Sequence, residues 1–186
     1  MLRQFDFEAT LVFIAFDREE QGLIGSTAYA NAHATDHILG MVSLDMIAYN
    51  PASANGAVIY GRTASDPLKV SLGNALAQFG GLSYSIQGRL DASDHAPFEA
   101  RGFQAALLSE QNVFNNPYYH TAADSVDTLG YIDYDFATQM VRGAVGWMAD
   151  EAVLVPEPES AFWLGIALVA VTLVRRARPL AHPRQP

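Results

Sequence analysis

Carboxylate and imidazole side chains follow three separate apolar segments of the chain, and their types suit metal-assisted chemistry. Glu19 and Glu20 follow the first segment, and Asp45 ends the second. His120 lies in the polar loop after the third. Carboxylate oxygen and imidazole nitrogen both bind Zn²⁺, and a catalytic zinc keeps one position open for water. A carboxylate that binds no metal can take a proton from that water and pass it to a leaving group. Adjacent glutamates alone are more often a solvated surface pair, so the assignment depends on the wider pattern.

The composition restricts both the ligands and the partners. The chain has 186 residues, with 20 acidic and 11 basic side chains and a formal net charge of −9 at pH 7. This balance argues against nucleic-acid binding through a basic face. The chain has no cysteine, which excludes a thiolate metal site and a disulfide framework. Any metal must therefore be held by His, Asp and Glu.

The elements that would carry these side chains alternate between apolar strands and helices. The apolar segments are bounded by charged residues or by glycine and proline. Alternating strands and helices predict an α/β fold with a largely parallel sheet. In such a sheet, sites collect in the loops beyond the carboxyl ends of the strands. The predicted strands are 9–16, 38–47, 57–60, 83–86 and 103–109, the predicted helices are 26–36, 66–79 and 134–151, and the segment 112–130 is predicted to be irregular.

Four short motifs occur in one order along this pattern. They are Glu-Glu-Gln-Gly-Leu-Ile-Gly-Ser at 19–26, Leu-Asp-Met at 44–46, Ser-Asp-His-Ala-Pro-Phe at 93–98 and Tyr-His-Thr-Ala-Ala-Asp at 119–124. In these motifs and their order, the chain resembles zinc exopeptidases of the aminopeptidase S/aminopeptidase Y type, over about residues 3 to 150. The resemblance implies part of a three-layer α/β fold, with a mixed, largely parallel sheet between helices. It also implies a site for two zinc ions.

The resemblance assigns a role to five side chains. Glu19 is implied as the general base, and Glu20 and His120 as ligands of the first zinc. Asp45 is implied as a ligand of the second zinc. Tyr119 is implied to stabilise the oxyanion of the tetrahedral intermediate, to which its phenol could donate a hydrogen bond. A packed loop aromatic is the alternative for Tyr119.

The segment that contains Asp94 and His95 superficially suggests a catalytic triad, because Ser93 precedes them. Three consecutive residues do not normally converge as nucleophile, base and orienting group, and triads are recognised by geometry. We therefore interpret Asp94 and His95 as residues that support the metal ligands or line the pocket.

The chain departs from the family before the first motif. The family site also uses a His and a bridging Asp that precede the Glu-Glu pair. Only 18 residues precede Glu19 here, their aspartates are Asp6 and Asp17, and the first histidine is His33. We therefore predict a truncated form with an incomplete two-zinc site, which binds zinc weakly because ligands are lacking.

The C-terminal region has a different composition from the rest. Pro156, Glu157 and Pro158 precede the uncharged stretch 161–174, and an arginine cluster begins at Arg175. Prolines interrupt helices and strands, so the globular fold is predicted to end near this motif. Its three parts, in this order, resemble the PEP-CTERM sorting signal of Gram-negative bacteria. The alternative is a hydrophobic helix docked on the globular part.

The sorting-signal resemblance divides the chain into a partial peptidase domain, 1–155, and a tail, 156–186. It implies export, temporary anchoring in the membrane through the C-terminal helix, and processing by an exosortase-type enzyme. An exported protein needs an apolar signal core, and residues 1–8 contain none. We therefore expect further residues upstream of the sequence.

The motifs together predict a zinc-dependent metallopeptidase, most simply an aminopeptidase that releases N-terminal residues from peptides. Carboxylates of the acidic site would attract the free ammonium group of such a substrate. A non-catalytic relative of the fold is one alternative, although it would have no physical reason to keep all five site residues. Glutaminyl cyclase chemistry, which uses one zinc on this scaffold, is another.

Overall fold

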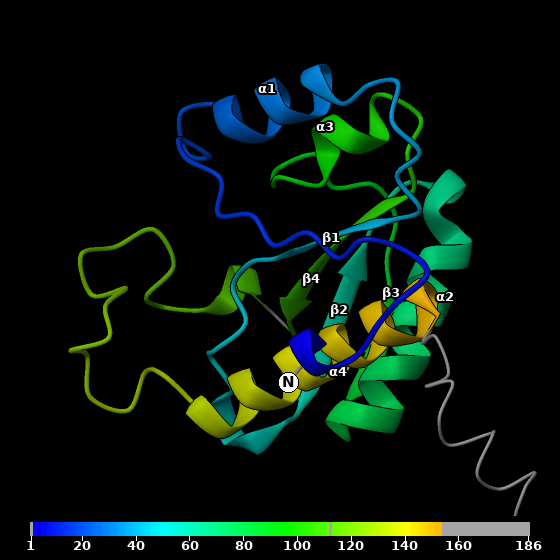
Figure 1. Cartoon of the computed structure of the whole chain (residues 1–186). Helices are drawn as coiled ribbons and strands as arrows, with labels where there is room; N and C mark the ends of the chain where they lie inside the picture. The colour runs from blue at the N-terminus through cyan, green and yellow to red at the C-terminus, as the bar shows by residue number, and fades with distance from the viewer. Residues whose placement is uncertain (1, 112, 154–186) are drawn as a thin grey trace, which may run out of the picture. The chain divides into compact units, whose positions relative to one another are not determined.

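The computed structural model describes residues 2–111 and 113–153 (Figure 1). Its contacts define two units. One is Ala9–Val153, called the body below, and the other combines Met1–Glu8 with Leu154–Pro186.

In the second unit, the described residues contain one short 3-10 helix, η1 (Leu2–Gln4). The predicted tail, 156–186, lies outside the described residues, and so does its predicted hydrophobic helix. Among the helices of the described ranges, none has the length and apolar character needed to span a membrane.

The body contains a mixed sheet of four strands in the order β1-β4-β2-β3. β1 runs parallel to β4, and β2 runs parallel to β3. β2 and β4 are antiparallel, which makes the sheet mixed. β1 therefore lies at one edge of the sheet and β4 beside it. The strand bounds are β1 (Met41–Leu44), β2 (Gly56–Tyr60), β3 (Ser83–Ile86) and β4 (Ala105–Glu110).

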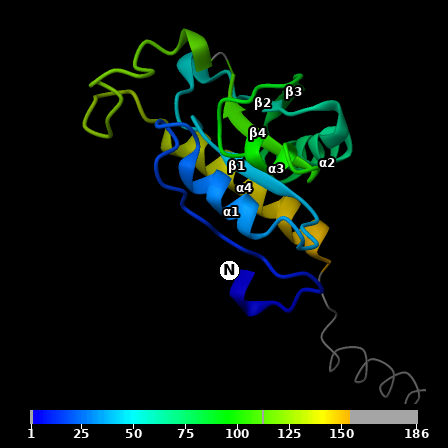
Figure 2. The same ribbon diagram turned by 90° about the horizontal axis from the view of Figure 1, so that it is seen from above.

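Helices cover both faces of the sheet, so the body has three layers (Figure 1). α2 and α4 pack on one face, and α1 and α3 lie on the other. Seen from above, α1 lies in front of β1 (Figure 2). The bounds are α1 (Ile24–Ala32), α2 (Asp66–Ala75), which continues as the π-helix η4 (Leu76–Gly80), α3 (Ala96–Glu99), α4 (Tyr134–Ala152), and the 3-10 helices η2 (Pro51–Ser53), η3 (Thr63–Ser65) and η5 (Val113–Asn115).

The central strand β4 is buried along its whole length, as its apolar sequence predicts. Successive side chains of a strand point to opposite faces. Accordingly, Ala106 and Leu108 join the apolar cluster formed with α2 and α4, while Ala105 joins the cluster on the other face. The sheet thus supplies a rigid base for the loops that leave its edge.

The prediction of a buried strand at 9–16 is wrong. The segment has no regular secondary structure, and Val12, Phe13 and Ile14 are 55%, 67% and 42% exposed. Within the described residues, its one backbone hydrogen bond to another part of the body runs from the Ala9 N–H to the Ala152 carbonyl, 3.2 Å away. A strand requires a neighbour that takes up its backbone groups, and apolar composition alone does not provide one.

Candidate active site

Five of the predicted site residues, Glu19, Glu20, Asp45, Tyr119 and His120, lie on three loops at one end of the sheet. Asp45 directly follows β1, and its N–H donates to the Leu108 carbonyl of β4 at 3.2 Å. Tyr119 and His120 lie on the long loop after β4. Because β1 and β4 are parallel, both loops leave the sheet at the same end. Topology therefore brings together residues that are far apart in the sequence.

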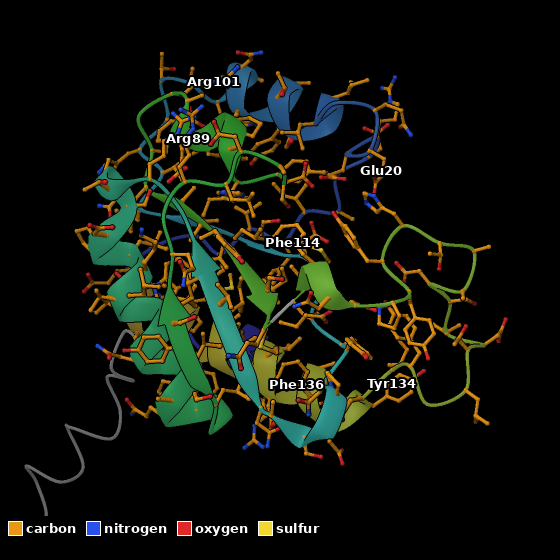
Figure 3. The ribbon with its side chains drawn as sticks, turned by 180° about the vertical axis from the view of Figure 1, so that it is seen from behind. Glu20, Arg89, Arg101, Phe114, Tyr134 and Phe136 are labelled. Atoms are coloured by element: carbon orange, nitrogen blue, oxygen red, sulfur yellow. The ribbon has the colours of Figure 1, made fainter. Side chains whose placement is uncertain are left out.

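The turn before α1 carries the two adjacent glutamates. It is closed by Gly22 and Leu23, whose N–H groups both donate to the Glu19 carbonyl, at 2.9 and 2.8 Å. Gly22 has a φ of 104°, a conformation that glycine adopts without strain. The motif that follows the glutamates thus folds into a tight turn. Glu20 faces the long loop after β4 (Figure 3).

Glu20 and His120 are in contact. The Nε2 atom of His120 lies 3.3 Å from Oε1 of Glu20. Both side chains are open to solvent, at 57% exposed for His120 and 65% for Glu20. The rings of Tyr119 and His120 are stacked, with centroids 4.0 Å apart, and Phe114 meets Tyr119 edge-on at 6.2 Å. The aromatic stack supports the imidazole beside the carboxylate.

Negative charge accumulates around this contact. Burial, and then repulsion from Asp45, Glu20 and Asp94, raise the pKa of Glu19, which His120 partly offsets. The pKa of Asp45 is also raised, mainly by burial and further by Asp94 and Glu20. Carboxylates that raise each other's pKa share one space without enough positive charge. A bound cation would supply that charge.

A hydroxyl group holds Asp45 in place. The Ser93 Oγ donates to Oδ2 of Asp45 at 2.9 Å and lies 3.3 Å from the Oγ of Ser43. Ser93 is buried, as is Ser43 on β1. Sequence reasoning singled out the neighbours of Ser93 and overlooked Ser93 itself. Its place in the third motif was the available signal.

Asp94 and His95 lie at different depths in this region. The charge of Asp94 contributes to the raised pKa values of Glu19 and Asp45. His95 is fully buried, and neither ring nitrogen has a hydrogen-bond partner within the described residues. Burial lowers the pKa of His95 and keeps it neutral near pH 7. His95 is therefore part of the packed interior behind the loops.

Tyr119 keeps its proton at neutral pH. Burial, followed by the charges of Glu20, Asp45 and Glu19, raises the pKa of its phenol. A protonated phenol beside carboxylates remains a hydrogen-bond donor.

The donor atoms fit zinc in type and are incomplete in number. Glu20 and His120 offer a carboxylate oxygen and an imidazole nitrogen, which are zinc ligands. In the part of the chain that the structure describes, no group of three or more His, Asp or Glu side chains is arranged to hold a metal ion. Asp45 belongs to the same charged region and does not complete such a group.

Solved structures of aminopeptidases share this fold. LapA aminopeptidase of Legionella pneumophila is 24% identical to this chain, with a TM-score of 0.66. The match covers 78% of this chain and 39% of LapA. The aminopeptidase of Aneurinibacillus sp. strain AM-1 is 32% identical, with a TM-score of 0.56, and the match covers 77% of this chain and 34% of that enzyme. BSAP, a zinc aminopeptidase of Bacillus subtilis, is 24% identical, with a TM-score of 0.59, and the match covers 76% of this chain and 38% of BSAP. The chain thus spans well under half of each of these proteins.

Sequence comparison gives the family. No curated protein matches the chain. Residues 1–146 match peptidase family M28, and this range contains the four motifs between residues 19 and 124 and every predicted site residue. The chain belongs to peptidase family M28.

Proposed function

We propose that this site binds zinc through Glu20 and His120 and serves a metallopeptidase that releases N-terminal residues from peptides. The observation that carries the proposal is the contact between these two side chains, 3.3 Å apart, from loops at opposite ends of the body's sequence. Membership of family M28 and the aminopeptidases among the structural neighbours support it. In this proposal Asp45 serves a second zinc ion.

The side chains divide the chemistry between them. When bound, zinc polarises a carbonyl group and lowers the pKa of a water molecule to about 7. Glu19, which binds no metal in this proposal, takes a proton from that water molecule and delivers it to the leaving amine. The Tyr119 phenol donates a hydrogen bond to the developing oxyanion. Carboxylates left free of metal hold the substrate ammonium group.

The proposal for location rests on the sequence of residues 156–186. In it, the protein is exported, anchored through the apolar stretch 161–174, and processed by an exosortase-type enzyme. The Pro-Glu-Pro motif, the uncharged stretch and the arginine cluster support this by their order. Fractionation of cells that express the gene together with its upstream region, with an epitope tag inserted before Pro156, tests this part separately. Recovery of the tagged protein in the cytoplasm alone would contradict it.

Zinc titration by calorimetry tests the site. We expect the wild-type chain to bind zinc weakly, because in the described residues Glu20 and His120 are in contact and no third ligand completes the group. Glu20→Gln and His120→Ala should each abolish the binding, whereas His37→Ala, which removes a histidine outside the site, should leave it unchanged. Binding that survives both site substitutions would refute the assignment.

Activity is the second measurement. Because ligands are lacking, we expect little hydrolysis of aminoacyl-nitroanilides by this chain. The hydrolysis that is measured should require zinc, should stop on addition of chelator, and should be lost in Glu19→Gln, which keeps the metal ligands. Chelator-insensitive hydrolysis would remove the zinc peptidase proposal. Cyclisation of N-terminal glutaminyl peptides without hydrolysis would instead favour the cyclase chemistry.

A further inference from the structure

Glu110, the last residue of β4, is a buried carboxylate beneath the site loops. It is 1% exposed. Its Oε2 atom accepts hydrogen bonds from the N–H groups of Ala48 and Tyr49, at 3.0 and 2.7 Å. Its Oε1 atom accepts one from Nδ2 of Asn116 at 3.0 Å. Burying an ionised group is costly, and three donors on one carboxylate offset that cost.

These contacts join two of the three loops that carry the site. Ala48 and Tyr49 belong to the loop that follows Asp45. The Oδ1 atom of Asn116 accepts from the Tyr118 N–H at 3.0 Å, immediately before Tyr119 and His120. Backbone contacts reinforce the link, because the Glu110 N–H donates to the Met46 carbonyl at 2.8 Å.

Aromatic side chains close the same junction. The rings of Tyr49 and Tyr118 meet edge-on at 5.9 Å, and Tyr131 lies 4.5 Å from Tyr118. The hydroxyl of Tyr131 donates to Asp124, which lies four residues after His120. The polar contacts of Glu110 thus form the inner part of a packed junction between loops.

We propose that Glu110 is a positioning residue for the metal site: it fixes the loop after Asp45 and the loop before His120 in one arrangement. This inference rests on the proposed function. Glu110 touches none of the proposed metal ligands. Its effect passes through backbone N–H groups on one side and through Asn116 on the other.

The pattern of donors and acceptors explains why a carboxylate is required. Each of the three groups that hydrogen-bond to the Glu110 side chain is a donor. In Glu110→Gln, the new amide can still accept from Ala48 and Tyr49 with its oxygen, but its NH₂ group faces the NH₂ group of Asn116. If the Asn116 amide turns over to accept that bond, it no longer accepts from the Tyr118 N–H.

A charge-conserving pair of substitutions tests this pattern. Glu110→Gln should leave the Tyr118 N–H without its acceptor and weaken zinc binding about tenfold. This is the lower end of the range seen when a residue that positions a metal ligand is changed. Asn116→Asp places a second carboxylate against Glu110 and should also weaken binding. The double variant restores a donor opposite an acceptor and leaves one carboxylate oxygen for the Tyr118 N–H. It should recover both zinc binding and slow exchange of the Tyr118 amide.

Glu99 provides the matched control. It is also buried, and its Oε1 atom accepts from the Arg62 N–H at 2.7 Å and the Ser65 hydroxyl at 2.6 Å. These partners follow β2, which is antiparallel to β4, so they lie at the opposite end of β4 from Glu110. Glu99→Gln should therefore lower the unfolding midpoint without a comparable loss of zinc affinity in the folded chain.

Each outcome decides between the proposals. If wild-type chain binds zinc and Glu110→Gln binds it equally with an unchanged Tyr118 amide, the positioning role is overturned. An equal loss of zinc affinity in Glu99→Gln would also overturn it, because the effect would then be general destabilisation. If wild-type chain binds no zinc, the proposed function fails. Amide exchange in the two single variants and the double variant then still decides the role of Glu110.

Discussion

The two faces of the sheet are covered to very different extents. On one face, residues of β2, β4, α2, η4 and α4 form a continuous buried cluster that includes Leu72, Leu108, Phe136 and Trp147. The indole N–H of Trp147 donates to the Ser71 hydroxyl at 2.9 Å and ties α4 to α2.

On the other face, the buried cluster consists of Ala30, Phe98 and Ala105. Phe16 and Tyr29 pack against it and are only partly buried, with ring centroids 6.1 Å from that of Phe98 in each case. Beside them, the apolar segment 9–16 leaves Val12, Phe13 and Ile14 exposed. The first face therefore supplies most of the stability, and the second carries the turn with Glu19 and Glu20 on a thinner base.

The largest effect is expected from Phe136→Ala on the well-covered face. Phe136 is 1% exposed and lies in the main cluster. Truncation of a fully buried Phe costs about 3–5 kcal/mol in transfer and cavity terms. Urea denaturation followed by far-UV circular dichroism measures the loss. A change of no more than about 0.5 kcal/mol, which is typical of surface positions, would show that this face does not dominate the stability.

A smaller loss of stability is expected at the start of α4, which belongs to the well-covered face. The Asp133 carboxylate caps α4 by accepting from the Phe136 N–H at 2.9 Å, and it also accepts from Asn50 at 2.9 Å. Removal of such a cap in Asp133→Ala costs about 1 kcal/mol. By contrast, α1, which lies on the face with the smaller buried cluster, has no side-chain cap.

The pH dependence of this effect has a definite sign. The hydrogen bond from Phe136, followed by that from Asn50, lowers the pKa of Asp133. A carboxylate whose pKa is lowered in the folded protein stabilises the folded state. This contribution is fully present above the unfolded-state pKa of about 3.9, and it is lost as the pH falls through the folded-state pKa. The stability difference between wild type and Asp133→Ala should be constant near pH 7 and shrink below about pH 4. A difference that grows in acid would contradict the cap assignment.

The sequence predicted an element correctly where its local pattern matched the packing or strand pairing that the fold provides. The predicted strand 83–86 coincides with β3, and the predicted helix 134–151 with α4 to within one residue. The predicted helix 66–79 coincides with α2 and η4 to within one residue, and Gly81, at a φ of 69°, follows it as the C-cap. Because β1 and β4 are parallel, the loop with Asp45 and the loop with Tyr119 and His120 leave the sheet at the same end.

What the sequence could not supply depended on contacts between distant residues. The segment 9–16 has the composition of a strand, yet composition does not specify a hydrogen-bonding neighbour. Glu110 stood at the end of an apolar segment and drew no attention, because its role comes from Ala48, Tyr49 and Asn116 on two other loops. Burial and donor geometry become visible only when those loops are folded together.

The smallest effect is expected at Phe13, and it tests the thinner face directly. Phe13 is 67% exposed, so Phe13→Ser should change the free energy of unfolding by no more than about 0.5 kcal/mol. Phe16→Ser, in the same segment, is the matched comparison, because Phe16 packs on Tyr29 and Phe98 with ring centroids 5.8 and 6.1 Å away. It should cost more. Removing an exposed apolar ring should also reduce self-association, measured by sedimentation velocity. Equal losses of stability at the two positions would show that the whole segment packs on the body and that the faces differ less than their exposures indicate.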